Sequence, residues 1–516
     1  MLLRAAVVVA LVLVSGCASL PTGYERSESH ALQDTGSTRL GQARQELLKA
    51  HPGETGCRPL SDGVDALVAR IVLAEVADRS LDVQYYIWRN DLTGRHMTSA
   101  LVRAADRGVR VRLLLDDLGT NADDDSLLAL DAHPHIEVRL FNPVASRSLK
   151  GLGALADFSR VNRRMHNKTF TADNQRAILG GRNIGDEYFA AGGDLAFSDL
   201  DVLMLGPTVA EVSASFDRYW NAPLSIPVAA LVGRRADLAG AEERRRQLEA
   251  LIETERDSPY VADARARIDQ ALAPDDSGLF WGQAHLLYDD PDKVNRAPED
   301  TEGHLLPQFE ALELQPRKHL LIVSPYFVPG DAGVAWLRGL VGQGVQVIIL
   351  TNSLAASDVS AVHAGYKRYR EALVEAGVRL YELRPDAVAG GLRKGFKGGL
   401  SGSRASLHAK TFIFDRRAVF IGSLNLDPRS VELNTEIGVV CQSVPLAEAM
   451  QDAIERHIDQ DAWRIELAVD AHGSSHLVWV ETGPDGVRRL KEEPQVSAWR
   501  KFGVWFLGLL PIESQL

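Results

Sequence analysis

Apolar positions along this chain fall into short runs that alternate with longer stretches of helical spacing. The runs are rich in Val, Ile and Leu, and they return in the same order in both halves, at residues 81–88, 109–117 and 136–143 and then at 319–328, 345–353 and 378–386. Such runs are typical of strands buried on both faces, and their alternation with helices gives α/β units. Gly108 and Gly344 lie where helix C-caps are expected. The pattern therefore predicts an α/β fold that is built twice.

The length of the chain agrees with two domains. It has 516 residues, of which 45% are hydrophobic, and this is enough for a large core. We expect a first domain over residues 46–232, a charged helical connector over 233–275 and a second domain over 276–516. The connector carries opposite charges four residues apart, which indicates surface helices, and we expect no functional role for it.

A second repeat lies inside the first. The motif H-x-K-x4-D occurs twice, and each copy is followed by Gly-x-x-Asn. The matching residues are His166, Lys168, Asp173, Gly180, Gly181 and Asn183 in the first copy, and His408, Lys410, Asp415, Gly422, Ser423 and Asn425 in the second. One copy can arise by chance, but two copies with the same downstream spacing indicate that both halves serve one site.

The spacing of each motif suits a strand. Residues two apart on a strand point to the same face, so His and Lys are expected to project together into one cleft. The flanking apolar residues predict two strands joined by a tight turn that carries the aspartate. A glycine at the end of the second strand lets backbone N–H groups approach an anion. Imidazole, ammonium, amide and hydroxyl groups that converge from two halves predict a phosphate site.

Charge and composition narrow the function. The formal net charge is −12, which argues against a nuclease that binds duplex DNA, because such binding depends on Lys and Arg at the phosphates. We expect no nucleic-acid partner. No cluster of Cys, His and carboxylate residues has the spacing of metal ligands, so we expect neither a metal nor another cofactor.

The N-terminus differs from the rest of the chain. Arg4 is followed by an apolar run that ends at Val14 and is too short to span a membrane, and then by Ser-Gly-Cys. This string resembles a bacterial lipobox, so residues 1–17 are expected to be a lipoprotein signal peptide and Cys17 the lipidated residue. Polar residues 18–45 are expected to form a tether. The catalytic body would then face the periplasm from a membrane, and Ala18, which is not the aspartate of inner-membrane retention, favours the outer membrane.

Cys57 and Cys441 are the cysteines left after such processing. Two cysteines in an oxidising compartment could pair. They lie near opposite ends of the folded region, however, and the sequence does not bring them together. We expect both to be buried thiols.

The paired motifs identify the chain as similar to the phospholipase D superfamily. Within it, the chain resembles the bacterial cardiolipin synthases of the C type from about residue 45 onward. The strings that carry this closer resemblance are YYIWRNDLTG (85–94), RVRLLLDDLG (110–119), SDLDVLMLGP (198–207), SPYFVPG (324–330), LNLDPRS (424–430), LNTEIG (433–438) and LLPIE (509–513). The resemblance implies two tandem domains, each a mixed sheet flanked by helices, related by a pseudo-twofold axis and sharing one active site.

The resemblance also implies roles for the motif residues. His166 would be the nucleophile and His408 the general acid and base, although the residues alone do not order them. Lys168 and Lys410 would offset the charge of the phosphate, aided by Asn183, Ser423 and Asn425. Asp173 and Asp415 have a mainly structural role in the family. Alignment of the two halves places Glu436 opposite Asp199, and we expect these carboxylates to orient the histidines.

The implied reaction is phosphatidyl transfer that makes cardiolipin from phosphatidylglycerol and a second phospholipid, either phosphatidylethanolamine or phosphatidylglycerol. The alternatives are a hydrolase of the phospholipase D type, a nuclease and a non-catalytic lipid-binding protein. Intact motifs argue against the last, because a binding protein needs neither histidine.

Three segments suit a lipid surface. Residues 146–164 and 390–406 read as loops that mix Gly and basic residues with apolar ones, and we expect them to face lipid. Residues 498–516 alternate aromatic residues with Leu, and they could either lie in the membrane interface or dock on the core.

Overall fold

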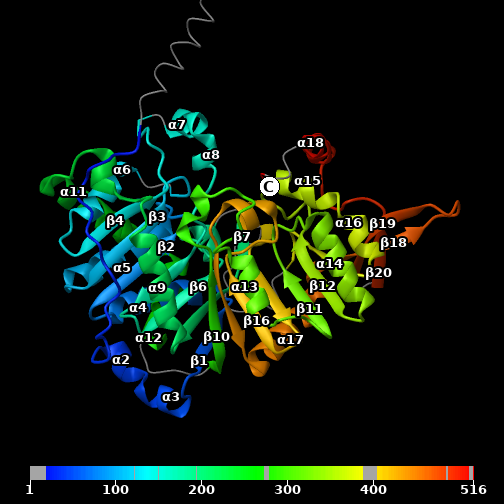
Figure 1. Cartoon of the computed structure of the whole chain (residues 1–516), viewed down its shortest axis with the longest axis horizontal. Helices are drawn as coiled ribbons and strands as arrows, with labels where there is room; N and C mark the ends of the chain where they lie inside the picture. Colours follow the sequence, from blue (N-terminus) through cyan, green and yellow to red (C-terminus); the bar gives the residue numbers. More distant parts are fainter. Residues whose placement is uncertain are drawn as a thin grey trace, which may run out of the picture.

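The computed structural model describes residues 19–120, 123–148, 150–192, 195–271, 278–387, 404–483, 486–510 and 515. The expected signal peptide and Cys17 lie outside these residues. In the described part, two mixed sheets stand next to each other with helices packed around them (Figure 1). The prediction of a twice-built α/β fold is confirmed.

The first sheet places three parallel strands beside an antiparallel region. Strands β2 (Ser80–Tyr85), β3 (Arg110–Asp116) and β4 (Ile136–Phe141) are parallel, and the remaining neighbours pair antiparallel. Its order is β9 (Ser225–Pro227), β4 (Ile136–Phe141), β3 (Arg110–Asp116), β2 (Ser80–Tyr85), β5 (Thr169–Ala172), β6 (Arg176–Gly180), β8 (Asp201–Leu205) and β1 (Thr55–Leu60).

The second sheet repeats this order and extends it. Its parallel strands are β11, β12 and β13. The order is β10 (Phe280–Tyr288), β17 (Ile437–Gln442), β16 (Ala418–Gly422), β15 (Lys410–Phe414), β11 (His319–Val323), β12 (Gln346–Asn352), β13 (Arg379–Leu383), β18 (Ala462–Val469), β19 (Ser475–Gly483) and β20 (Gly486–Leu490). The motif hairpins β5–β6 and β15–β16 therefore occupy equivalent positions in the two sheets.

Helices flank both sheets (Figure 1). In the first half they are α2 (Arg39–Ala43), α3 (Gln45–Ala50), α4 (Gly63–Val76), α5 (Leu92–Asp106), α6 (Asp124–Asp131), α7 (Lys150–Ala156), α8 (Phe158–Val161), α9 (Thr208–Trp220) and α10 (Val228–Val232). The charged connector forms α11 (Leu238–Glu255), which buries none of its residues, and α12 (Pro259–Ala271). The second half has α13 (Leu305–Ala311), α14 (Gly330–Gly342), α15 (Ser360–Lys367), α16 (Arg370–Glu375), α17 (Val444–Asp461) and α18 (Ala498–Gly508).

The two sheets are joined at their edges. Strand β1 of the first half pairs antiparallel with β10 of the second, from Thr55 opposite Gly282 to Cys57 opposite Phe280. Beneath this junction, buried residues of β6 and β8 belong to the same apolar cluster as residues of β16 and β17. The halves therefore share one core, which fixes their motif hairpins relative to each other.

The segment predicted as a tether is bound to the first half. Residues 19–38 contain no helix or strand. They lie along the surface of the first half and are held there by hydrogen bonds, some of them from buried arginines. Arg112 donates to the carbonyl oxygen of Ser29, and Arg139 donates to that of Ser27. The backbone N–H of Ala31 donates to the Asp217 carboxylate at 2.9 Å. The sequence prediction missed this because many of the contacts are made by backbone groups, which leave no pattern in the sequence, although Leu20 and Tyr24 also pack against the core of the first half.

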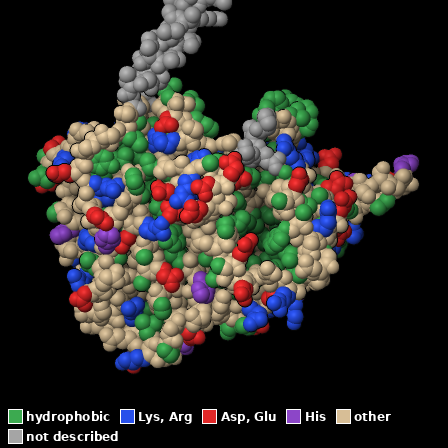
Figure 2. Space-filling view, in the orientation of Figure 1, with side chains coloured by type: hydrophobic (Ala, Val, Ile, Leu, Met, Phe, Trp, Pro, Cys, Tyr) green, Lys and Arg blue, Asp and Glu red, His purple; other side chains and the backbone are tan. Residues whose placement is uncertain are grey.

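Two of the segments expected at a lipid surface take defined forms. Residues 146–164 are not a plain loop, because they contain α7 and α8. The C-terminal tail forms α18, whose Val504 packs against Leu354 and Ala364, while the apolar side chains at the upper right of Figure 2 remain exposed. Of residues 390–406, only 404–406 are described, and they belong to β14 (Arg404–Leu407). Among the described helices, none has both the length and the apolar character that crossing a bilayer requires.

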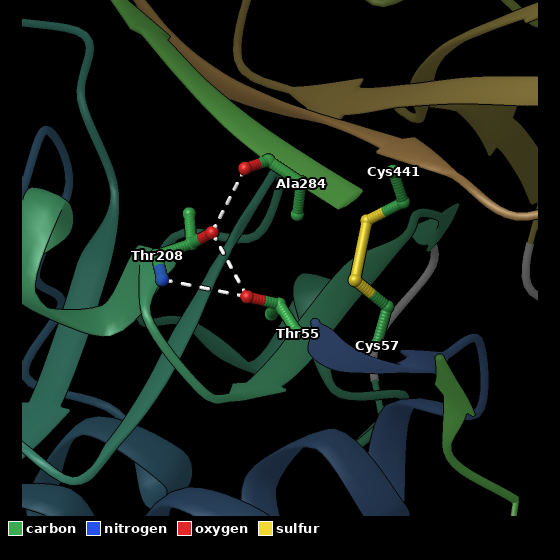
Figure 3. Close-up of a disulfide and its surroundings, with 5 residues drawn as sticks. All are labelled: Thr55, Cys57, Thr208, Ala284 and Cys441. Atoms are coloured by element: carbon green, nitrogen blue, oxygen red, sulfur yellow. Dashed lines mark hydrogen bonds between the residues drawn. A yellow bond between two sulfur atoms is a disulfide. The ribbon is translucent and has the colours of Figure 1, made fainter. Parts of the chain in front are cut away.

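The expectation of two free thiols is wrong. Cys57 of β1 and Cys441 of β17 form a disulfide across the junction of the sheets (Figure 3). Both residues are 1% exposed. Beside them, the Thr208 hydroxyl donates to the carbonyl oxygen of Ala284 at 3.0 Å. The sequence could not show this pairing, because 384 residues separate the cysteines and the contact depends on β10 lying between their strands.

Candidate active site

Each motif histidine follows directly after a short segment that pairs with a strand or bridge of the other half. Met165 forms a parallel bridge with Thr435, and the next backbone N–H, that of His166, donates to the Thr435 carbonyl at 2.9 Å. In the same way β14 pairs parallel with β7 (Leu195–Ser198), and the His408 N–H donates to the Ser198 carbonyl at 2.8 Å. The backbone therefore delivers each histidine next to the residue that follows the partner strand.

Those following residues are the two predicted carboxylates. The Nδ1 atom of His166 lies 2.9 Å from Oε2 of Glu436, and the Nδ1 atom of His408 lies 2.6 Å from Oδ2 of Asp199. Each histidine is thus oriented by a carboxylate of the opposite half. A carboxylate at Nδ1 holds the proton there and leaves Nε2 as the reactive ring atom.

The two carboxylates are held differently. The Ser423 hydroxyl donates to Glu436, whereas Asp199 accepts the backbone N–H of Leu200 at 2.8 Å. A Cβ atom at Gly181, the position that matches Ser423, would lie 2.1 Å from Oδ1 of Asp199. The absence of a side chain at Gly181 therefore makes room for the shorter acid.

Two lysines lie beneath the histidines. Lys168 and Lys410 are both buried, and each Nζ donates to the carbonyl oxygen of the histidine in its own motif. Burial and the positive charge of Lys410 lower the pKa of Lys168 to about 7, and burial lowers the pKa of Lys410 to about 8. Near neutral pH the site therefore keeps positive charge that a phosphate group can neutralise.

The histidine environments differ in charge. Burial, with the nearby lysines, holds the pKa of His166 well below its ordinary value, and burial with Lys410 also lowers the pKa of His408. Burial raises the pKa of Glu436 to about 7. Burial acts the same way on Asp199, but His408 and Lys410 outweigh it and hold the pKa of that carboxyl below its ordinary value. Asp199 is therefore ionised at neutral pH, while Glu436 is close to its midpoint.

The motif asparagines lie beside the histidines. Asn183 accepts the backbone N–H of Ile87 at 3.1 Å through its side-chain oxygen. Asn425 donates to the Ser430 hydroxyl at 3.3 Å. Both asparagines line the same cavity as the two histidines.

This cavity has a volume of about 990 Å³ and lies between the two halves. Aromatic rings flank both histidines. Tyr86 stands edge-on to His166 with ring centroids 5.1 Å apart, and Tyr188 stands edge-on to His408 at 5.2 Å. Phe197 also contacts the His408 ring. These ring contacts restrict the movement of both imidazoles.

Several lining residues were not singled out by the sequence analysis. The Tyr326 hydroxyl donates to Asp358 at 2.8 Å, and Arg429 borders the same space. Burial raises the pKa of Asp427, another lining residue, to about 7. Tyr86, Tyr326, Asp427 and Arg429 all fall within the strings that carried the family resemblance, and this was the available signal.

The motif aspartates lie at the far ends of the hairpins. Asp173 accepts the N–H groups of Asp78, Arg79 and Ser80 ahead of β2, with distances of 2.8–2.9 Å. Asp415 accepts those of Arg317, Lys318 and His319 ahead of β11. Both residues have positive φ, of 52° and 50°. The structure therefore does not bring them to the cavity, and each fixes a turn to the start of a neighbouring strand.

Within the described ranges, no group of three or more His, Cys, Asp or Glu residues is arranged to hold a metal ion. The site offers instead two imidazoles whose Nε2 atoms are available, two buried ammonium groups and amide donors around one cavity. This set can bind a phosphodiester, attack its phosphorus and move a proton to or from an alcohol oxygen.

Comparisons with known proteins agree with this chemistry. Residues 70–220 and 313–458 match the family described as "Cardiolipin synthase, PLD-like domain". The chain is 44% identical over 484 residues to cardiolipin synthase C of Escherichia coli (strain K12), which covers 92% of this chain and 99% of that protein. It is 29% identical over 404 residues to cardiolipin synthase A of Pseudomonas entomophila, over 78% of this chain and 68% of that one.

A solved structure shares the fold. The phosphatidylserine synthase of Haemophilus influenzae Rd KW20 superposes with a TM-score of 0.55 at 16% sequence identity, and the match covers 93% of this chain and all of that one. The two-half architecture thus extends beyond relatives of high sequence identity.

Proposed function

Because the chain belongs to the phospholipase D superfamily and, within it, to the cardiolipin synthases of the C type, we propose that it transfers a phosphatidyl group to phosphatidylglycerol and so makes cardiolipin. The donor is phosphatidylethanolamine or a second phosphatidylglycerol. The observation that carries the proposal is the crossed pairing of His166 with Glu436 and of His408 with Asp199. It supports one two-histidine site that is complete only when both halves contribute.

The first step forms a phosphohistidine. Nε2 of His166 attacks the phosphorus of the donor, and the bond from phosphorus to the headgroup oxygen breaks. His408, in its imidazolium form, gives a proton to that oxygen, and the headgroup leaves as ethanolamine or glycerol. A neutral His166 suits the nucleophile, and its strongly lowered pKa supports this assignment. Burial and Lys410 lower the pKa of His408, but the ionised Asp199 opposes them and favours the imidazolium form that a general acid requires.

The second step reverses the roles. The headgroup hydroxyl of phosphatidylglycerol gives its proton to His408 while its oxygen attacks phosphorus. The bond between phosphorus and His166 breaks, and its electron pair returns to the imidazole. Cardiolipin leaves, and His408 is again imidazolium. Lys168 and Lys410 offset the negative charge on the phosphoryl oxygens in both steps, and Asn183, Ser423 and Asn425 support the groups around them.

Hydrolysis is the competing outcome. If water replaces phosphatidylglycerol in the second step, the product is phosphatidic acid and the enzyme is a phospholipase D. The fate of the phosphohistidine depends on how the acceptor is positioned. A cavity of about 990 Å³ gives room for a second headgroup, which supports transfer.

The test uses purified protein with vesicles that contain phosphatidylethanolamine and phosphatidylglycerol. We expect cardiolipin to exceed phosphatidic acid. His166→Ala and His408→Ala should each lower the rate by about a thousandfold or more, because the two residues act in series. His472→Ala, on an exposed turn outside the cavity, is the matched control. Phosphatidic acid as the main product would make the protein a hydrolase, and cleavage of DNA with no lipid turnover would make it a nuclease.

We further propose that the protein acts in the bacterial envelope, facing the periplasm, as a lipoprotein anchored at Cys17. The lipobox-like string supports the anchor, and the disulfide between Cys57 and Cys441 supports an oxidising compartment. Intact-mass analysis of membrane-extracted protein tests for lipid at Cys17. The residue after Cys17 is Ala18 and not the aspartate of inner-membrane retention, which favours the outer membrane.

A further inference from the structure

Two groups of large exposed apolar side chains lie on α7, α8 and α18. On α18 and at its end they are Trp499, Phe502, Trp505, Phe506 and Leu509, and on α7 and α8 they are Leu152, Leu155 and Phe158. Trp499 is 83% exposed and Leu155 is 71% exposed. The helices that carry them, α7, α8 and α18, lie at the same end of the molecule, at the top of Figure 1. Large exposed apolar surfaces on a folded protein mark places where a partner or a membrane binds.

Helix α18 packs on the protein through the face opposite its exposed aromatic side chains. At about 100° per residue, Trp499, Phe502 and Phe506 fall on one side of the helix, and Val504 falls on the opposite side. Val504 is buried against Leu354 and Ala364. At the ends of the helix, Arg500 donates to the Ser357 carbonyl and Arg368 donates to that of Gly508. The aromatic side chains are therefore presented outward by a docked helix, not by a loose tail.

A residue of the cavity lining links the two helical regions. Gln515, shortly after α18, lines the cavity. Its side-chain oxygen accepts from Asn162, the residue that ends α8, at 2.6 Å, and its carbonyl accepts from Arg429 at 3.0 Å. Val362 of α15, the helix on which α18 packs, also lines the cavity. A surface that covers both groups would thus also cover the opening.

The basic residues around these helices are already engaged. Lys501 pairs with Glu492 at 2.8 Å, Arg160 pairs with Asp157 at 2.6 Å, and Lys150 lies 3.3 Å from Asp117. A membrane contact here would accordingly rest on apolar side chains more than on attraction to anionic headgroups. Trp and Phe suit this, because aromatic side chains are favoured at the boundary between headgroups and acyl chains.

We propose that α18 together with α7 and α8 forms a lipid-docking face that inserts its apolar side chains into one leaflet and sets the cavity mouth against the headgroups. This inference rests on the proposed function, because an enzyme that joins two phospholipids must draw both from a membrane. It deepens that function by identifying the elements that contact the bilayer.

The first test is local and works with or without an N-terminal anchor. Mature protein is bound to vesicles of phosphatidylethanolamine and phosphatidylglycerol whose acyl chains carry bromine, which quenches tryptophan fluorescence on contact. We expect quenching in the wild-type protein and loss of most of it when Trp499→Phe and Trp505→Phe are combined. Trp336→Phe is the matched control, since Trp336 is 51% exposed on α14 and lies outside the proposed face. Equal quenching in the double variant and the wild type would overturn the proposal.

The second test separates docking from chemistry. We expect Trp499→Ser, Phe502→Ser and Phe506→Ser together to reduce transfer on vesicles by about tenfold, because the apolar contact with the leaflet is lost. Turnover of a short-chain phosphatidylglycerol that stays monomeric should be unchanged, which also shows that the variant is folded. Val469→Ser with Val487→Ser, two exposed residues on the β18–β20 extension, is the control.

The outcomes distinguish this inference from the proposed function. Unchanged transfer on vesicles by the triple variant overturns the docking face and leaves the function intact. Quenching without any transfer overturns the function and leaves the docking face. A change of oligomeric state in the triple variant, with vesicle transfer preserved, would assign the face to a second copy of the chain and would also overturn the proposal. High salt should reduce quenching little, because the basic residues here are paired.

Discussion

At the scale of single residues, the site is asymmetric although its motifs repeat. Glu436 is held by the Ser423 hydroxyl, and Asp199 fills the space beside Gly181. Glu436 titrates near neutral pH, while the pKa of Asp199 is held low by His408. The two carboxylates therefore differ in protonation near neutral pH, and this gives the two histidines different electrostatic surroundings.

This asymmetry predicts a pH profile. The lysine cations exist below their pKa values of about 7 and about 8 and are lost above them, so kcat/KM should fall as pH rises from about 7 through about 8. It should also fall below about 7, where Glu436 takes up a proton. A bound phosphodiester favours the ammonium forms, so the alkaline fall in kcat should lie at higher pH than that in kcat/KM.

The measurement uses a soluble phosphodiester over the full range of pH at which the protein is folded. Lys410→Arg is the informative variant, since a guanidinium does not titrate in this range and should remove the part of the alkaline fall near pH 8 while the part near pH 7, due to Lys168, remains. A kcat/KM that keeps rising beyond pH 8 would contradict the charge assignment of the lysines.

Gly181 gives a second prediction at this scale. Gly181→Ala would place a Cβ atom 2.1 Å from Oδ1 of Asp199 and so displace this carboxylate from His408. A displacement of about 1 Å of the group that orients His408 should lower kcat by about a hundredfold. Gly339→Ala on α14, where a Cβ would meet nothing within 4 Å, is the control and should leave kcat unchanged. Equal rates for the two variants would show that Asp199 need not be fixed.

The sequence predicted these site residues because the same residue types recur at the same spacing in both halves. His166, Lys168, Asn183 and their second-half matches all fall at fixed offsets. Tyr188 and Phe197 have no such mark, because an aromatic ring against an imidazole looks like any other core residue in a sequence. Their position depends on how the segment between the two motif hairpins folds back.

At the scale of elements, alternation of apolar runs predicted the strands and helices that build the two sheets. It did not predict β7 and β14, which pair across the halves. A strand of four residues whose partner lies in the other half leaves no periodic signal long enough to recognise. It also missed the bound course of residues 19–38, which is held through backbone groups by Arg112, Arg139 and Asp217.

The prediction at the scale of elements concerns the stability that the disulfide between β1 and β17 provides. It closes a loop over a sequence separation of 384 residues, so its loss should lower the free energy of unfolding by about 2–5 kcal/mol. Urea unfolding of Cys57→Ala/Cys441→Ala, compared with the wild type in the presence and absence of reductant, measures this. Reductant should destabilise the wild type to the level of the variant and leave the variant unchanged.

A direct thiol count is the control for that experiment. Denatured, non-reduced protein should show neither Cys57 nor Cys441 as a free thiol. If both react, the bond is not formed in the protein as isolated, and the argument for an oxidising compartment loses its support.

At the scale of the whole molecule, the sequence predicted two equivalent halves around one site, but not how they join. Strand β1 has no feature in its sequence that marks it as the partner of β10. The pairing of these two edge strands depends on the packing of the shared core beneath them. That core contains residues of β6, β8, β16 and β17. Long-range packing of this kind is set by the whole fold and not by any local pattern.

The crossed pairing of histidines and carboxylates has a consequence for how such a protein can change over time. Two identical chains that met in this way would have to carry the same residue at both equivalent positions, since each chain would occupy both places. A single chain with two halves is free of that constraint. Gly181 opposite Ser423 and Asp199 opposite Glu436 are substitutions of this kind. Joining the halves in one polypeptide thus lets selection tune the surroundings of one histidine without altering the other.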